Sequence, residues 1–105
     1  MKLKINNITW DIKFTEDIEE GFFGYTNVYK LKIGIRSDMA LDVVRTTIIH
    51  ELIHAMIFSY GFIKAQPEDE LLFSEEQVAD FIAMNLDEIN KLSNKIYLNF
   101  LRSII

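Results

Sequence analysis

The sequence lacks cysteine, and it has only two histidines among its 105 residues. The absence of cysteine excludes a disulfide scaffold, an iron–sulfur site, a thiol nucleophile and a zinc site built from thiolates. Any metal or imidazole chemistry must therefore use the two histidines together with oxygen ligands and water. The positions of these histidines are the first thing to establish.

Basic residues are fewer than acidic ones, 11 against 16, so the formal net charge is −5. A nucleic-acid-binding domain normally carries a basic face, so we expect no nucleic-acid partner. The longest strongly apolar stretch, residues 46–62, is interrupted by two histidines and a glutamate and is too short and polar to span a membrane. The N-terminal residues have no signal-peptide pattern. We therefore expect a cytoplasmic protein without a membrane partner.

The length fits one domain, residues 1–105, and the apolar content is enough to fill a core. Residues 2–14 alternate between apolar and polar side chains on either side of Asn6-Asn7, which predicts a β-hairpin. Residues 15–24 predict a loop or a short helical turn, and residues 28–35 predict another strand. As an edge strand, 28–35 could pair with an extended substrate; as an interior strand it would have no such role.

A helix is expected next, with Ser37 or Asp38 as its N-cap and Gly61 as its left-handed stop. A connection over residues 62–72 contains the only proline, Pro67. The second half of the helix is apolar on nearly every side, so it should be a buried central helix.

A second helical segment begins at Ser74, which forms a capping box with Gln77. Apolar residues then recur at helical spacing over about thirty residues. The pattern leaves open whether this is one helix or two, broken near Asn85 or Asn90. The whole chain therefore predicts an α+β fold, with a small antiparallel or mixed sheet at the N-terminus, a central helix, and a C-terminal helix or helix pair.

Both histidines lie in one pentapeptide, His50-Glu51-Leu52-Ile53-His54. Residues i and i+4 share one helix face, so both imidazoles can reach one metal ion, and Zn²⁺ suits a site without thiolates. Glu51 is turned by about 100° from His50 on the helix, where it can contact a metal-bound water instead of ligating. A carboxylate there can accept the water's proton and pass it to a leaving amine.

A catalytic zinc site takes three protein ligands, and without a third histidine or a cysteine the third must be a carboxylate. The candidates are Glu75, Glu76 and Asp80 on the second helix. Glu76 shares a face with Ala79 and Ala83, whose small side chains would allow close approach to the first helix. We therefore favour Glu76 as the ligand over Glu75. Asp80, one turn on, could accept the N–H of a ligating imidazole.

These residues resemble a known family. The pentapeptide resembles the zincin motif, and residues 76–83 resemble the Glu-x-x-Ala-Asp/Asn-x-Phe-Ala segment of small gluzincins of the ImmA/IrrE type, which are common in phages and mobile elements. Ile82 stands where that segment usually has Phe. The resemblance covers about residues 25–85.

This resemblance implies a zinc metallopeptidase that cleaves a cytosolic protein or peptide. It implies His50, His54 and Glu76 as metal ligands and Glu51 as the general base. Larger members of the family carry a partner domain that has no counterpart in this sequence, so the resemblance leaves the substrate unassigned.

The group that stabilises the oxyanion of the reaction is not evident from the sequence. Tyr25 is a candidate, as are Tyr29, Tyr60 and Arg36, although each of them also fits an ordinary core or surface role. Two alternatives to a peptidase stay open. One is a non-catalytic zinc-binding module that interacts with a protein. The other is a structural or interaction protein that acts through the amphipathic residues 86–105, which more often pack on the domain's own sheet than form a dimer.

Overall fold

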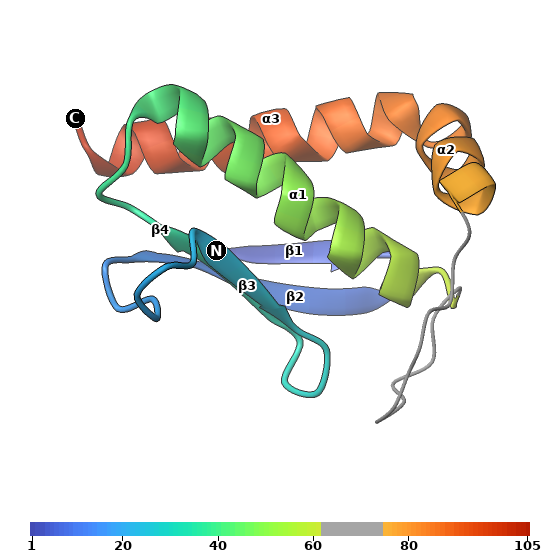
Figure 1. The fold of residues 1–105 in the computed structure, drawn as a ribbon, viewed down its shortest axis with the longest axis horizontal. Helices are drawn as coiled ribbons and strands as arrows, with labels where there is room; N and C mark the ends of the chain where they lie inside the picture. Colours follow the sequence, from blue (N-terminus) through green and yellow to red (C-terminus); the bar gives the residue numbers. More distant parts are fainter. Residues whose placement is uncertain (62–74) are drawn as a thin grey trace.

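The computed structural model describes residues 1–61 and 75–105 and has two layers, a mixed sheet and a layer of helices over one of its faces (Figure 1). The elements are β1 (Lys2–Ile5), β2 (Ile8–Thr15), β3 (Gly24–Asn27), β4 (Lys32–Arg36), α1 (Leu41–Ser59), α2 (Glu75–Met84) and α3 (Leu86–Ser103). The predicted α+β class is confirmed. Within the described ranges, no helix combines the length and the apolar character that crossing a bilayer requires.

The predicted N-terminal hairpin is confirmed. β1 and β2 pair antiparallel, with Ile5 opposite Ile8. Asn6 and Asn7 form the turn between them with φ of 47° and 68°. Asparagine tolerates this left-handed backbone, which a two-residue hairpin turn requires. The Asn6 side chain also donates a hydrogen bond of 2.9 Å to the carbonyl oxygen of Ser59, which ties the turn to the end of α1.

A second hairpin, β3–β4, corrects the prediction for the middle of the sheet. Residues 28–31 were expected in a strand, but they lie in the turn between β3 and β4. Leu31 has φ of 56°, and the side-chain oxygen of Asn27 accepts hydrogen bonds of 3.0 Å from the backbone N–H groups of Tyr29 and Lys30. This asparagine turn reverses the direction of the chain after β3. β3 itself begins at Gly24, which was expected to be the last residue of the loop 15–24.

The strand order is β1-β2-β4-β3. β4 pairs with β2 in parallel and with β3 antiparallel, so it is an interior strand. The interior alternative for the predicted strand is therefore the correct one. The edge strand on this side of the sheet is β3, which lies against α1 (Figure 1).

The start of α1 differs from the prediction, whereas its end agrees with it. The helix begins at Leu41 with Ala40 as N-cap and without a side-chain capping hydrogen bond. Ser37 still donates its N–H to the carbonyl oxygen of Thr15 at 3.1 Å, and Asp38 forms an ion pair with Arg36 at 3.8 Å. Neither Ser37 nor Asp38 is therefore the N-cap of α1.

The end of α1 is fixed by a left-handed glycine, as expected. Gly61 has φ of 80°, and its N–H reaches the carbonyl oxygen of Phe58 at 2.9 Å. Glycine adopts this conformation without a steric cost from a Cβ atom.

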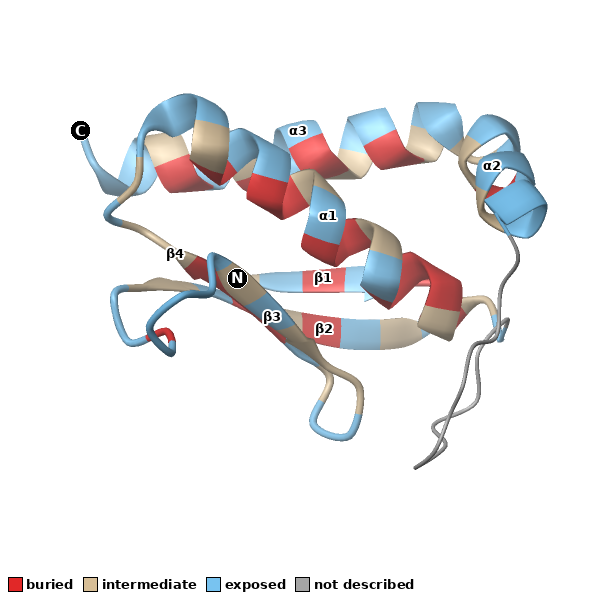
Figure 2. Cartoon of the chain, viewed as in Figure 1, coloured by how far each residue is buried: buried red, intermediate tan, exposed pale blue. Residues whose placement is uncertain are grey.

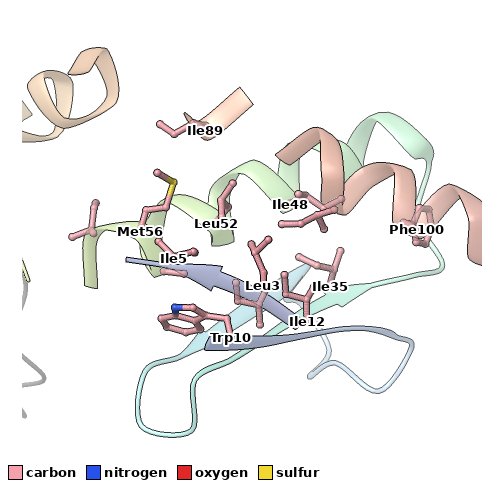
Figure 3. Packing of buried hydrophobic residues seen from close by; sticks show 14 of the residues in the cluster. Leu3, Ile5, Trp10, Ile12, Ile35, Ile48, Leu52, Met56, Ile89 and Phe100 are labelled. Carbon is pink, nitrogen blue, oxygen red and sulfur yellow. The ribbon is translucent and has the colours of Figure 1, made fainter. Parts of the chain in front are cut away.

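The core lies between the sheet and the helices. Figure 3 shows Ile48, Leu52 and Met56 of α1 in one cluster with residues of the strands and with Ile89 and Phe100 of α3. The three α1 residues are at most 1% exposed. Buried residues alternate with more exposed ones along β1 and β2, as Figure 2 shows, whereas the interior strand β4 has three consecutive buried residues. The Trp10 indole N–H donates to the Ser59 hydroxyl at 2.8 Å, so these two buried polar groups are hydrogen-bonded to each other within the apolar core.

The C-terminal segment consists of two helices separated at Asn85, one of the two expected positions. The Asn85 side-chain amide donates to the carbonyl oxygen of Phe81 at 2.8 Å, which closes the end of α2. α3 packs on α1 and on the sheet, where the rings of Phe100 and Phe14 lie 4.8 Å apart. The expected capping box involves Ser74, which lies outside the described residues.

Candidate active site

His50 and His54 lie one turn apart on α1, and their Nε2 atoms are 3.3 Å from each other. Two nitrogen ligands at about 2.0–2.1 Å from one tetrahedral zinc ion would be separated by about 3.3–3.4 Å. The two imidazoles therefore point toward a common position at a spacing that fits a shared zinc ion. Both residues are exposed, so that position is accessible from solvent.

The electrostatics of His54 favour its neutral form. Partial burial of the ring lowers the pKa of His54 from its ordinary value of 6.5, and the neighbouring His50 lowers it further, while the carboxylate of Glu51 opposes both effects. A metal binds the neutral imidazole and competes with protons for it. A lowered pKa thus keeps this nitrogen available at neutral pH.

Glu51 is buried beside the two exposed histidines, with 7% of its surface accessible. Its carboxylate oxygen Oε1 accepts a hydrogen bond of 2.6 Å from the hydroxyl of Thr26 on β3, and the same hydroxyl lies 3.1 Å from the Glu51 carbonyl oxygen. A buried carboxylate is costly unless it is hydrogen-bonded, and Thr26 provides that bond. The contact also fixes the orientation of the side chain.

Thr26 belongs to the candidate site, although no pattern in the sequence pointed to it. It was missed because residues 24–27 were not assigned to a strand, and a four-residue strand with one apolar residue has little alternation to recognise. The signal that could have found it is the asparagine turn that follows, since Asn27 and the next residues mark the end of a strand.

Gly24 allows β3 to lie close to α1. A Cβ atom on Gly24 would stand 2.6 Å from the Gly34 carbonyl oxygen, 3.0 Å from Cγ2 of Thr47 and 3.3 Å from Cγ of Glu51. Only glycine fits at this distance without displacing the backbone of β4. The close approach keeps the edge strand against the turn of α1 that carries Glu51.

An open pocket of about 280 Å³ lies next to this turn. Residues 21–24, which lead into β3, line one part of it, and Thr46, Thr47, His50 and Glu51 of α1 line the other. The buried carboxylate and one imidazole therefore border a space that a substrate could enter. Concave sites of this kind, with a few polar groups in an apolar lining, are typical of binding sites.

The predicted carboxylate partners on α2 are not brought to the histidines in the described structure. Glu75, Glu76 and Asp80 are exposed, and so are Ala79 and Ala83, the small residues expected to face α1. Among the described residues, 1–61 and 75–105, no group of three or more His, Cys, Asp or Glu side chains is arranged to hold a metal ion. Glu76 as third ligand and Asp80 as its neighbour stay predictions.

The structure also leaves Tyr25 apart from the histidines. Its ring packs over Gly34, its partner across β3 and β4, whereas the neighbouring Thr26 points toward Glu51. Side chains alternate between the faces of a strand, so Tyr25 lies on the face away from α1. The predicted role of Tyr25 as oxyanion stabiliser does not fit this geometry.

The other oxyanion candidates have structural partners. Tyr29 is exposed in the β3–β4 turn, and the hydroxyl of Tyr60 donates to the carboxylate of Glu88 at 2.7 Å. The guanidinium of Arg36 donates to three backbone carbonyl oxygens of the segment between β2 and β3. None of these contacts directs the group toward the histidines.

Comparisons with known proteins do not identify this site. A scan against protein-family models, a search of curated proteins and a search of solved structures found no match to the chain. The resemblance to the small gluzincins therefore stays a prediction that rests on two motifs, residues 50–54 and 76–83.

Proposed function

We propose that the protein is a zinc-dependent metallopeptidase that hydrolyses peptide bonds in a protein or peptide substrate. The observation that carries this proposal is the convergence of the His50 and His54 Nε2 atoms at 3.3 Å beside a buried, hydrogen-bonded Glu51, at the border of an open pocket. Thr26 satisfies one oxygen of the buried Glu51 carboxylate, but the described residues hold no ion-pair partner for its charge. A role in proton transfer would account for a buried carboxylate at this position.

His50 and His54 would hold the zinc ion through their Nε2 atoms, with Glu76 as the predicted third ligand. When bound, zinc would polarise the scissile carbonyl and lower the pKa of a water molecule, so that this water could lose a proton and attack the carbonyl near neutral pH. Glu51 would accept the proton of that water and deliver it to the leaving amine. Thr26 would hold one carboxylate oxygen of Glu51, which leaves the other oxygen for the proton.

The edge strand β3 supports a peptide substrate over a small molecule. Its backbone borders the pocket at Gly24, and among the described strands it pairs with β4 alone. An extended peptide can add to such an edge through backbone hydrogen bonds.

Exchange of a single carboxylate for an amide tests the proposal. The wild-type protein should bind one zinc ion and cleave members of a quenched fluorescent peptide library. Glu51→Gln should keep the zinc and reduce kcat by at least about a hundredfold, the usual contribution of a general base. Asp87→Asn, an exposed carboxylate on α3, is the matched control and should leave both zinc content and kcat unchanged.

Two results would contradict the proposal in different ways. Purified protein that takes up less than one zinc ion, even after zinc is added, would remove the metal site. Stoichiometric zinc without hydrolysis of any peptide would favour the non-catalytic zinc-binding module instead.

A further inference from the structure

The segment between β2 and β3 presents two phenylalanine side chains to solvent. Phe22 is 55% exposed and Phe23 is 58% exposed, and both line the pocket that His50 and Glu51 border. An isolated exposed apolar residue is common, but two adjacent aromatic rings at the rim of a pocket form a patch of the kind that binds ligands. Figure 2 shows that most of this segment is exposed.

This segment is held in place and does not depend on a ligand for its shape. Arg36 donates to the carbonyl oxygens of Ile18 at 2.8 Å, Glu19 at 3.1 Å and Phe22 at 3.0 Å. The backbone N–H of Arg36 also donates to the carbonyl oxygen of Phe23 at 2.8 Å. The side chain of Ile18 is buried, which holds the middle of the segment against the rest of the protein. The backbone that carries the two rings is therefore preorganised, which lowers the entropic cost of binding.

The same segment is strongly acidic. Four exposed carboxylates precede the two rings, those of Glu16, Asp17, Glu19 and Glu20. Within the described part of the chain, none of them forms an ion pair. Unpaired carboxylates in the segment that leads into the pocket favour a ligand that combines apolar and positively charged groups.

We propose that Phe22, Phe23 and the pocket beside Glu51 form a specificity subsite for a peptide with an aromatic side chain flanked by lysine or arginine. The aromatic side chain would enter the pocket against the two rings, and the flanking cations would lie near the carboxylates of residues 16–20. This inference rests on the proposed peptidase function for its position beside the reacting groups, but binding at the subsite can be measured without hydrolysis.

The test uses the Glu51→Gln protein with zinc present, so that peptides bind without being cleaved. The probe is a short fluorescein-labelled peptide with a central phenylalanine between lysine and arginine. Two matched peptides replace the phenylalanine by alanine or the two cations by glutamate. Fluorescence anisotropy should give the tightest binding for the first peptide and binding weaker by about tenfold when the phenylalanine is removed.

Variants of the protein locate the effect. Phe22→Ala combined with Phe23→Ala should weaken binding of the aromatic peptide by about tenfold and have little effect on the alanine peptide. Tyr29→Ala is the matched control, because Tyr29 is an exposed aromatic residue outside the pocket, and it should change nothing. Glu19→Gln combined with Glu20→Gln should weaken binding severalfold and reduce its dependence on salt.

The outcomes separate this inference from the proposed function. If the wild-type protein cleaves peptides without this preference and the phenylalanine variants bind all peptides normally, the subsite is wrong and the peptidase proposal stands. If the preference and its dependence on Phe22 and Phe23 are found but nothing is cleaved, the subsite stands and the peptidase proposal fails. A concentration-dependent dimer in sedimentation that the phenylalanine variants abolish would show that a second copy of the chain occupies the rings, which overturns the inference.

Discussion

The turn of α1 that carries His50, Glu51 and His54 and the first turn of α2 that carries Glu76 are held in different ways. The α1 turn lies on the sheet, with Leu52 completely buried and Glu51 bonded to β3. In α2 the only buried residue is Phe81, whose ring stands 6.4 Å from that of Tyr60, and Glu76 is exposed. The core therefore fixes the turn that carries the two histidines, while the position of the predicted ligand Glu76 depends on how α2 docks.

The first and largest predicted effect concerns zinc affinity. His54→Ala should lower the affinity by more than the roughly 10–100-fold that accompanies loss of an outer-shell partner, because it removes a direct ligand. Glu76→Ala should weaken binding far more than Glu75→Ala, its matched neighbour in the same helical turn. Competition with a chromophoric chelator measures all three affinities. A larger loss for Glu75→Ala would transfer the predicted third ligand to Glu75.

The second prediction measures how firmly each region is packed. Leu52→Ala should lower the free energy of unfolding by about 3 kcal/mol, because Leu52 is fully buried in the hydrophobic core. Met84→Ala at the end of α2 should change it by less than about 0.5 kcal/mol, because Met84 is 83% exposed. Urea unfolding followed by circular dichroism gives both values. Equal losses would mean that the side chain of Met84 is as well packed as that of Leu52, which would contradict its exposure.

The third prediction concerns the hydroxyl that fixes Glu51. Thr26→Val keeps the shape of the side chain but leaves a buried carboxylate oxygen without its donor, which should cost about 1–2 kcal/mol of stability. If Glu51 is the general base, kcat should also fall while KM stays nearly constant, since Thr26 positions a reacting group and does not bind substrate. Thr26→Ser restores the hydroxyl and should recover most of both losses. Unchanged kcat in Thr26→Val would show that the hydrogen bond is only structural.

The features that the sequence predicted correctly are those set by local chemistry. Asn6 and Asn7 take the left-handed backbone of a tight turn, and Gly61 ends α1, because these residue types tolerate positive φ in any context. The spacing of His50 and His54 brings the two rings together on any regular helix. These features need no knowledge of distant residues.

The features that were missed depend on contacts between distant parts of the chain. Asp38 could have capped α1, but its ion pair with Arg36 uses it elsewhere. Thr26 reaches Glu51 only because Gly24 lets β3 lie close to α1. The face shared by Glu76 and Ala79 follows from helical spacing, whereas the direction in which that face points depends on the packing of α2, which spacing does not determine.

The smallest predicted effect tests the contact that joins the end of α1 to α3. The Tyr60 hydroxyl donates to both carboxylate oxygens of Glu88, at 2.7 Å and 2.9 Å. This hydrogen bond, together with burial and the negative charge of Glu88, raises the pKa of Tyr60 above its usual value of 10.0. Below pH 10 the phenol keeps its proton in both states, so the contact contributes fully to stability. Above pH 10 the unfolded chain ionises first, and the contribution is lost as the pH rises through the folded pKa.

Tyr60→Phe removes this contact, and because the pair is partly exposed the loss at pH 8 should be at the lower end for a hydrogen bond, about 0.5 kcal/mol. The difference in free energy of unfolding between the wild type and Tyr60→Phe should then shrink when urea unfolding is repeated at pH 10 and pH 11. The remaining tyrosines titrate in both proteins and cancel in this difference. No difference at any pH from 8 to 11 would mean that Tyr60 stabilises the helix junction through its ring, which packs near Phe81 and which phenylalanine retains, and that its hydroxyl contributes nothing.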